Sequence, residues 1–108
     1  MSRIERRFAA LREEGRAGLA TYLTAGDPDP DTSARLFGGL AGAGADLIEI
    51  GMPFSDPMAD GPAIQASSQR ALKHHTNLRM VLDAVAEFRE HEIETPVVLM
   101  GYYNPIYH

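Results

Sequence analysis

The sequence predicts an α/β protein built around a parallel sheet, and two observations carry this prediction. Segments with the composition of buried strands alternate with segments whose apolar residues recur every three to four positions, as in helices. One strand candidate, residues 97–100, is continuously apolar, which is typical of a buried parallel strand. Strands that alternate with helices are joined by right-handed crossovers and lie parallel. We expect strands at 17–25, 46–51 and 97–100, and helices at 2–14, from 31 or 32 to 44, 62–73 and 78–90.

Residues that start and stop helices support the first half of this assignment. Ser2 and Glu5 have capping-box spacing, and Gly15 ends the first apolar pattern. The segment 26–30 contains two prolines, which end the first strand in a turn. The second helix is expected to begin on a side-chain cap at residue 31 or 32 and to stop at Gly44.

The second half follows the same logic. The segment 52–61 is rich in proline and predicts a loop after the second strand. Pro62 suits the first position of a helix because its missing amide donor is not needed there. Asn77 is the expected cap of the last helix, and Pro96 precedes the last strand.

Length and composition limit the classes of function. The chain has 108 residues, 44% hydrophobic and 23% charged, so we expect a single domain over residues 1–108. The net charge of −5 argues against a nucleic-acid partner. The absence of cysteine excludes disulfides and thiol chemistry, and no apolar run is long enough for a membrane span or a signal peptide. These features predict a cytoplasmic protein with no membrane partner.

Two carboxylates are the candidates for chemistry. Glu49 lies in an apolar strand, where its burial costs free energy unless it meets water or a ligand at the carboxyl end of the sheet. A carboxyl group withdrawn from water is suited to proton transfer, although Glu49 would be inert if it pointed outward. Asp60 lies on the following loop and would either meet Glu49 across a pocket or simply cap the next helix. Two adjacent histidines, His74 and His75, diverge too widely on a helix to hold one metal ion.

Three strand-end segments occur in order along the chain: TAGDP at 24–28, DLIEIGMPFSDPMADGP at 46–62 and LMGYYNP at 99–105. Together they resemble the tryptophan synthase alpha chain family over nearly the whole chain. The resemblance implies a (β/α)8 TIM barrel, of which this chain covers about the first three strands and their helices. Such a barrel takes about 250 residues. On this fold we expect Leu23, Ile48 and Leu99 to face the barrel interior.

The resemblance also implies an activity, the cleavage of indole-3-glycerol phosphate to indole and glyceraldehyde 3-phosphate in tryptophan biosynthesis. Glu49 and Asp60 would be its catalytic carboxylates. The reaction would need no cofactor and no metal, because protonation of the indole ring at C3 creates the electron sink for retro-aldol cleavage. The positions implied to line the substrate pocket are Tyr22, Ile64, Met100 and Tyr102. Tyr22 stands where phenylalanine is common in the family, so its hydroxyl needs a hydrogen-bond partner.

A partner is implied as well, the tryptophan synthase beta chain, in a heterotetramer of two alpha and two beta chains. The candidate contacts are Pro53, Phe54, Ser55, Asp56 and Asn104. Loops that grip phosphate in such barrels follow strands seven and eight, so the phosphate anchor is not among these residues. Two alternatives to this interpretation stay open: a non-catalytic partial barrel that only docks on the beta chain, and a different phosphate-handling barrel lyase.

Overall fold

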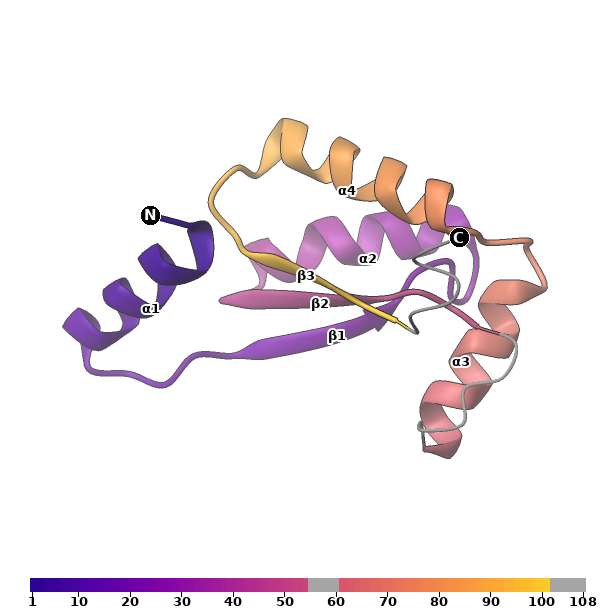
Figure 1. The fold of residues 1–108 in the computed structure, drawn as a ribbon, viewed down its shortest axis with the longest axis horizontal. Helices are drawn as coiled ribbons and strands as arrows, with labels where there is room; N and C mark the ends of the chain where they lie inside the picture. The colour runs from indigo at the N-terminus through magenta and orange to yellow at the C-terminus, as the bar shows by residue number, and fades with distance from the viewer. Residues whose placement is uncertain (55–60, 102–108) are drawn as a thin grey trace.

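A computed structural model describes residues 1–54 and 61–101 of the chain. Within these ranges the elements are α1 (Arg3–Glu14), β1 (Ala20–Thr24), α2 (Pro30–Gly42), β2 (Leu47–Gly51), α3 (Pro62–Leu72), α4 (Leu78–His91) and β3 (Val97–Met100). The strands form a parallel sheet in the order β1-β2-β3 (Figure 1). The predicted α/β class, element order and parallel pairing are confirmed.

Most helix ends agree with the sequence, and one start was predicted wrongly. Ser2 and Glu5 form the expected capping box, and Gly15 ends α1 in the left-handed conformation with φ 67°. Helix α2 starts at Pro30, earlier than predicted, because the side chain of Asp29 accepts a hydrogen bond from the Thr32 amide at 2.8 Å. Proline at the first helical position costs no hydrogen bond. Asp29 and Pro30 can therefore belong both to the predicted turn and to the start of α2.

The strand register decides which side chains share a face of the sheet. Tyr22 on β1 is level with Glu49 on β2, which is level with Val98 on β3. Side chains alternate along each strand, so every second residue lies on the same face. We call this face the open face; it consists of Ala20, Tyr22, Thr24, Leu47, Glu49, Gly51, Val98 and Met100.

The opposite face is covered by α2 and α4, which lie together on one side of the sheet (Figure 1). Ile48 and Ile50 are fully buried there in a cluster with Phe37 of α2 and Phe88 of α4, whose rings stack with centroids 4.4 Å apart. Burying such side chains stabilises the fold by about 1.5–3 kcal/mol each. The core therefore lies between the sheet and these two helices.

The expectation for Leu23, Ile48 and Leu99 is wrong. All three belong to the covered face and pack in or against the cluster beneath α2 and α4. The error arises because parallel strands carry apolar residues on both faces, so hydrophobicity alone does not tell which face is inside a barrel. The open face carries the residues that a barrel would enclose.

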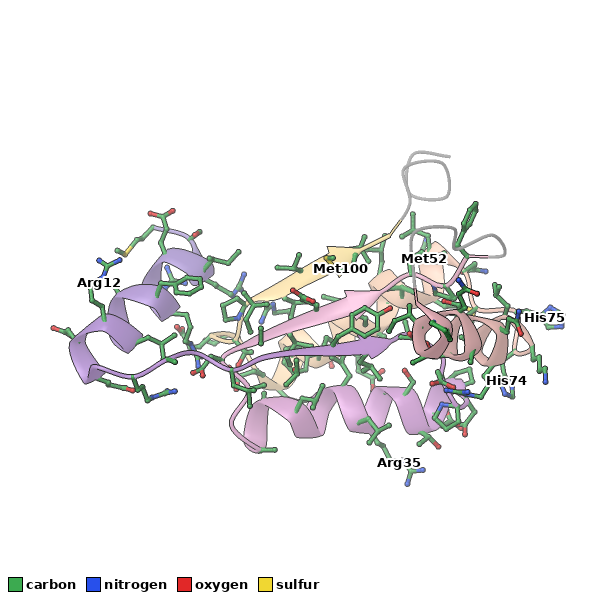
Figure 2. The ribbon with its side chains drawn as sticks, turned by 90° about the horizontal axis from the view of Figure 1, so that it is seen from below. Arg12, Arg35, Met52, His74, His75 and Met100 are labelled. Atoms are coloured by element: carbon green, nitrogen blue, oxygen red, sulfur yellow. The ribbon has the colours of Figure 1, made fainter. Side chains whose placement is uncertain are left out.

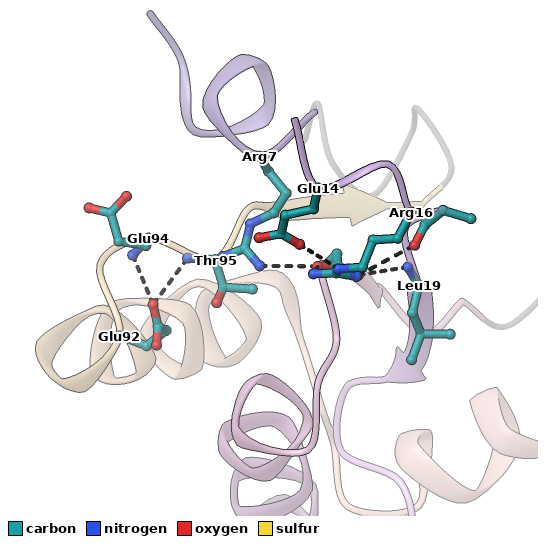
Figure 3. Close-up of polar contacts among 9 residues, drawn as sticks. Arg7, Glu14, Arg16, Leu19, Glu92, Glu94 and Thr95 are labelled. Atoms are coloured by element: carbon teal, nitrogen blue, oxygen red, sulfur yellow. Dashed lines mark hydrogen bonds and ion pairs between the residues drawn. The ribbon is translucent and has the colours of Figure 1, made fainter. Parts of the chain in front are cut away.

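Helix α1 lies at the amino-terminal ends of the strands, where a buried carboxylate ties it to the sheet (Figure 3). Asp46 is 3% exposed and accepts hydrogen bonds from Arg16 at 3.0 and 3.1 Å, from the Leu19 amide at 2.9 Å and from Arg7 at 3.3 Å. The hydrogen bonds from Arg16 and Leu19 hold the pKa of the Asp46 carboxyl well below its usual range. In the described part of the chain, no helix combines the length and apolar character needed to cross a membrane.

Candidate active site

Glu49 is the central residue of β2 and lies in the middle of the open face. Its neighbours in register are Tyr22 on β1 and Val98 on β3. Its side chain is half-buried, and among the described residues no hydrogen bond or ion pair to its carboxylate is present. A carboxylate placed between an aromatic and an aliphatic side chain on the open face of a parallel sheet is suited to exchange protons with a ligand.

Tyr22 provides the wall beside Glu49. The residue is 39% exposed, and its hydroxyl lies 3.1 Å from the Thr24 hydroxyl, so the expected hydrogen-bond partner is confirmed. The ring extends toward Gly51, which is level with Thr24 in the register. A Cβ atom at Gly51 would lie 2.0 Å from the Tyr22 hydroxyl oxygen. The absence of a side chain at Gly51 is therefore what lets the Tyr22 ring occupy this place.

Two further predicted pocket residues are described. Met100, 43% exposed, lies on the open face at the end of β3, level with Gly51 (Figure 2). The amide of Met52 donates to the Met100 carbonyl oxygen at 2.7 Å, which continues the pairing of β2 with β3 one residue beyond the end of β2. Ile64 is half-buried in the first turn of α3, and its carbonyl oxygen accepts a hydrogen bond from Ser67 at 2.9 Å.

Two contacts join α3 to the end of β1 and to the turn that follows it. The hydroxyls of Thr24 and Ser67 lie 2.7 Å apart in the interior. One helical turn further on, Arg70 forms a two-pronged ion pair with Asp27, at 2.7 and 3.1 Å. These contacts place α3 at the carboxyl end of the strands, away from α2 and α4 (Figure 1).

Several predicted site residues lie outside the described residues: Ser55, Asp56, Asp60, Tyr102 and Asn104. The first residue of α3 is Pro62, as predicted, and the capping position before it is Gly61. The position that would cap this helix with a side chain is thus not residue 60, which argues against a capping role for Asp60.

Two candidate partner contacts follow β2 directly. Pro53 is buried, and Phe54 is half-buried and makes contacts of its own. Pro53 would therefore shape this segment rather than offer its side chain to another protein. His74 and His75 lie at the α3 end of the molecule, away from the sheet, and the described residues contain no group of three metal-ligating side chains (Figure 2).

Three residues that sequence reasoning did not single out contribute to the site: Thr24, Gly51 and Ser67. Thr24 and Gly51 lie within the strand-end segments 24–28 and 46–62, but the sequence indicates no separate role for either residue. The contact between Thr24 and Ser67 joins residues 43 positions apart, so no local pattern reveals it. The role of Gly51 depends on the ring that lies above it, which follows from the register of β1 and β2.

The chain resembles known proteins over nearly its whole length. The family model of the tryptophan synthase alpha chain matches residues 8–108. A tryptophan synthase alpha chain from Thioalkalivibrio sulfidiphilus is 60% identical over 106 residues, which is 98% of this chain and 40% of the relative. The chain thus spans about 40% of the length of such relatives.

Solved structures agree in fold over the same region. The tryptophan synthase subunit alpha of Legionella pneumophila superposes with a TM-score of 0.96 at 47% identity, covering 99% of this chain and 41% of that one. A tryptophan synthase complex from Pyrococcus furiosus matches with a TM-score of 0.77 at 52% identity, covering 83% of this chain and 36% of that one. The sheet and its helices correspond to the first part of a (β/α)8 barrel.

Proposed function

Because this chain belongs to the tryptophan synthase alpha chain family, we propose that it supplies the catalytic carboxylates of a lyase that cleaves indole-3-glycerol phosphate into indole and glyceraldehyde 3-phosphate. One observation supports this most directly. Glu49 is half-buried on the open face, beside Tyr22 and Val98, and among the described residues its carboxylate has no partner. The remaining barrel strands of a full-length family member would enclose this face and exclude water from it.

Glu49 is proposed as the acid and base. As an acid it delivers a proton to C3 of the indole ring, which turns the ring into an electron-poor iminium group. As a base it accepts the proton of the glycerol hydroxyl next to the ring. The carbon–carbon bond then breaks, its electron pair returns to the ring as indole forms, and the hydroxyl-bearing carbon leaves as the aldehyde of glyceraldehyde 3-phosphate. Each step moves a proton or an electron pair without a cofactor or a metal.

Asp60 is proposed as the second carboxylate. It would accept a hydrogen bond from the ring N–H and stabilise the positive charge that develops on the ring. Tyr22, Ile64, Met100 and Tyr102 are proposed to form the apolar wall around the ring. Gly61 at the capping position of α3 supports the active-site role of Asp60 over a capping role.

The test is a pair of variants in the full-length protein that carries this segment. Glu49→Gln keeps the size of the side chain and removes its acid function, so turnover should fall by at least about 10²-fold with substrate affinity largely retained. Asp60→Asn should also lower turnover without a matching loss of thermal stability. Glu90→Gln, an exposed change on α4, is the matched control. Turnover of Glu49→Gln within a few-fold of the parent would refute the assignment.

We also propose a partner, the tryptophan synthase beta chain, met by the segment after β2 through Phe54, Ser55 and Asp56, with Pro53 shaping the segment and Asn104 contributing from the segment after β3. The Pyrococcus furiosus structure, described as a tryptophan synthase complex, supports a shared mode of assembly. Asp56→Ala should weaken association with the beta chain in titration calorimetry, whereas Asp83→Ala on the exposed side of α4 should not. Unchanged affinity for Asp56→Ala would exclude its part in docking.

The same measurements separate an enzyme from a docking module. A protein that binds the beta chain and never releases indole would be a non-catalytic docking module. We further propose that residues 1–108 form one structural unit of the larger barrel and that the protein is cytoplasmic, which the lack of cysteine supports.

A further inference from the structure

Helix α3 is held on the described part of the chain by polar contacts more than by apolar packing. Its buried side chains are Ser67, Ser68 and Ala71, all of them small. The hydrophobic cluster among the described residues contains no residue of α3. In Figure 1 the helix lies at the carboxyl end of the strands, apart from the two helices that cover the sheet. Apolar packing is non-directional, so directional polar contacts decide how α3 is placed.

Two of these contacts reach α3 from one short segment, residues 24–27 at the end of β1. The hydroxyls of Thr24 and Ser67 lie 2.7 Å apart in the interior. At the other end of the segment, the Asp27 carboxylate accepts two hydrogen bonds from the Arg70 guanidinium, at 2.7 and 3.1 Å. A guanidinium that binds a carboxylate through two nitrogens fixes the direction of the pair as well as its distance.

The segment 24–27 is itself held in place. The Gly26 amide donates to the Ser33 hydroxyl at 2.9 Å, which ties the segment to α2. A Cβ atom at Gly26 would lie 2.2 Å from the Thr76 hydroxyl oxygen, so the backbone here is already against the turn that follows α3. Thr76 donates to the carbonyl oxygen of Ala71 at 3.0 Å. The segment therefore provides α3 with a fixed support.

The two polar contacts together fix the rotation of α3 about its own axis. Ile64, Ser67 and Arg70 follow one another at intervals of three residues, so each is the surface neighbour of the next. Ser67 also donates to the Ile64 carbonyl oxygen at 2.9 Å. A single contact at Ser67 would let the helix turn about that point, and the ion pair of Arg70 prevents this. The direction of the half-buried Ile64 side chain thus depends on Arg70.

We propose that Asp27 and Arg70 are positioning residues, which hold α3 in the rotation that places Ile64 in the wall of the substrate pocket. This inference rests on the proposed function for its effect on the substrate, whereas the dependence of α3 on the ion pair rests on the contacts alone. Both side chains act through α3. Because a pocket wall meets bound substrate and transition state alike, loss of the ion pair raises KM and leaves kcat nearly unchanged.

The test uses variants of the full-length protein that alter the ion pair. The side chains of Arg70 and Asp27 are 53% and 17% exposed, so Arg70→Gln should raise KM by about fivefold, the upper end for a pair that water reaches. Arg70→Lys keeps the charge without the two-pronged geometry, and its KM should lie between those of the parent and Arg70→Gln. Arg79→Gln breaks the exposed ion pair with Asp83 on α4; it is the matched control and should leave KM unchanged.

A double-mutant cycle tests whether the two residues act as a pair. Asp27→Asn should raise KM as Arg70→Gln does, and the double variant should raise it no further than the more affected single variant. Effects of the two changes that simply multiply would overturn the proposal. So would a KM for Arg70→Gln equal to that of the parent, including the case in which only kcat falls, because that pattern reports lost folded protein and not a displaced pocket wall.

A second readout does not depend on activity. In protein labelled with carbon-13 at the Cδ1 methyl of isoleucine, the Ile64 resonance is the one lost in Ile64→Leu. It should shift in Arg70→Gln and in Asp27→Asn, and stay in place in Arg79→Gln. If it shifts and the parent does not cleave the substrate, the proposed function is refuted and the positioning of α3 stands. If it stays in place and the parent is active, the positioning is refuted and the proposed function stands.

Discussion

At the scale of single residues, the missing side chain of Gly51 is the most constraining feature of the site. Gly51→Ala would bring a methyl group within 2.0 Å of the Tyr22 hydroxyl oxygen and 2.6 Å of the ring carbon that bears it. We expect this variant to lose about 1–3 kcal/mol of unfolding free energy, as for other overpacked interiors. Urea unfolding of the full-length protein measures the loss.

A second glycine provides a matched control, because the same substitution there should raise the unfolding free energy instead of lowering it. Gly38 on α2 is exposed, and a Cβ atom there would meet nothing within 4 Å, so Gly38→Ala should stabilise the protein by about 0.5–1 kcal/mol. Adding Tyr22→Ala to Gly51→Ala removes the clash and should relieve the clash-specific part of the loss. A Gly51→Ala protein as stable as its parent would contradict the steric argument.

A second residue, Asp46, gives a prediction about pH. Its carboxyl has a pKa below the usual value, because Arg16 and the Leu19 amide bind the charged form. The ionised group therefore contributes stability in full above its unfolded pKa, about 3.9, and that contribution fades as the pH falls toward the lower folded pKa. Asp46→Asn should thus lower the urea midpoint most at pH 7, and its effect should begin to shrink by pH 3, where part of the contribution is already lost.

The exposed Asp83, which pairs with Arg79 on α4, provides the comparison for this experiment. Asp83→Asn should change the midpoint little at either pH, because exposed ion pairs contribute little. A difference between Asp46→Asn and its parent that stays constant from pH 7 to pH 3 would show that the carboxyl charge is not the stabilising element.

At the scale of elements, side-chain caps determine where the helices begin. The Asn77 side chain accepts a hydrogen bond from the Met80 amide at 3.0 Å and thereby caps α4, which carries Phe88 and Val81 into the core. Asn77→Ala should lower the unfolding free energy by about 1 kcal/mol, and Asn77→Asp should lower it much less. Thermal unfolding of both variants checks this, and equal melting temperatures for Asn77→Ala and the parent would rule it out.

Local signals explain how well the elements could be predicted. The capping box at Ser2, the cap at Asn77 and the proline at position 62 all mark true helix starts, and residues 97–100 form a strand with the predicted bounds. The start of α2 was misplaced because Asp29 and Pro30 can serve either a turn or a helix start, and only the hydrogen bond to Thr32 decides between them.

The site was predictable only in part, for a physical reason. A carboxylate in an apolar strand is visible in the sequence, and Glu49 was identified as a candidate in this way. The face on which a side chain lies depends on pairing between strands, so Leu23, Ile48 and Leu99 were assigned to the wrong face. The contact between Thr24 and Ser67 depends on the packing of α3, which no periodicity encodes.

At the scale of the molecule, the open face determines how the 108-residue segment behaves by itself. Tyr22 and Met100 are exposed on this face, and β1 and β3 form the two edges of the described sheet. Exposed apolar side chains beside unpaired strand edges favour association. We expect the isolated segment to form oligomers in analytical ultracentrifugation and to turn over no indole-3-glycerol phosphate.

A double variant with lysine at Val98 and Met100 tests the cause of that association. Both positions lie on the open face, so the two charges should shift the isolated segment toward smaller species. The same charges placed at Leu36 and Leu82, which are exposed on α2 and α4, should have little effect. A sharp spectrum of a monomer, together with measurable release of indole by the unmodified segment, would contradict this prediction.

The order of the strands also determines the sequence in which the sheet can form during synthesis. In the described sheet each strand pairs with the strand that follows it along the chain. No later strand is inserted between two earlier ones. On a ribosome, β1 and β2 can therefore pair, with α2 packed against them, before β3 has been synthesised. A barrel assembled in this way grows from one edge, and the open face is among the first surfaces to form.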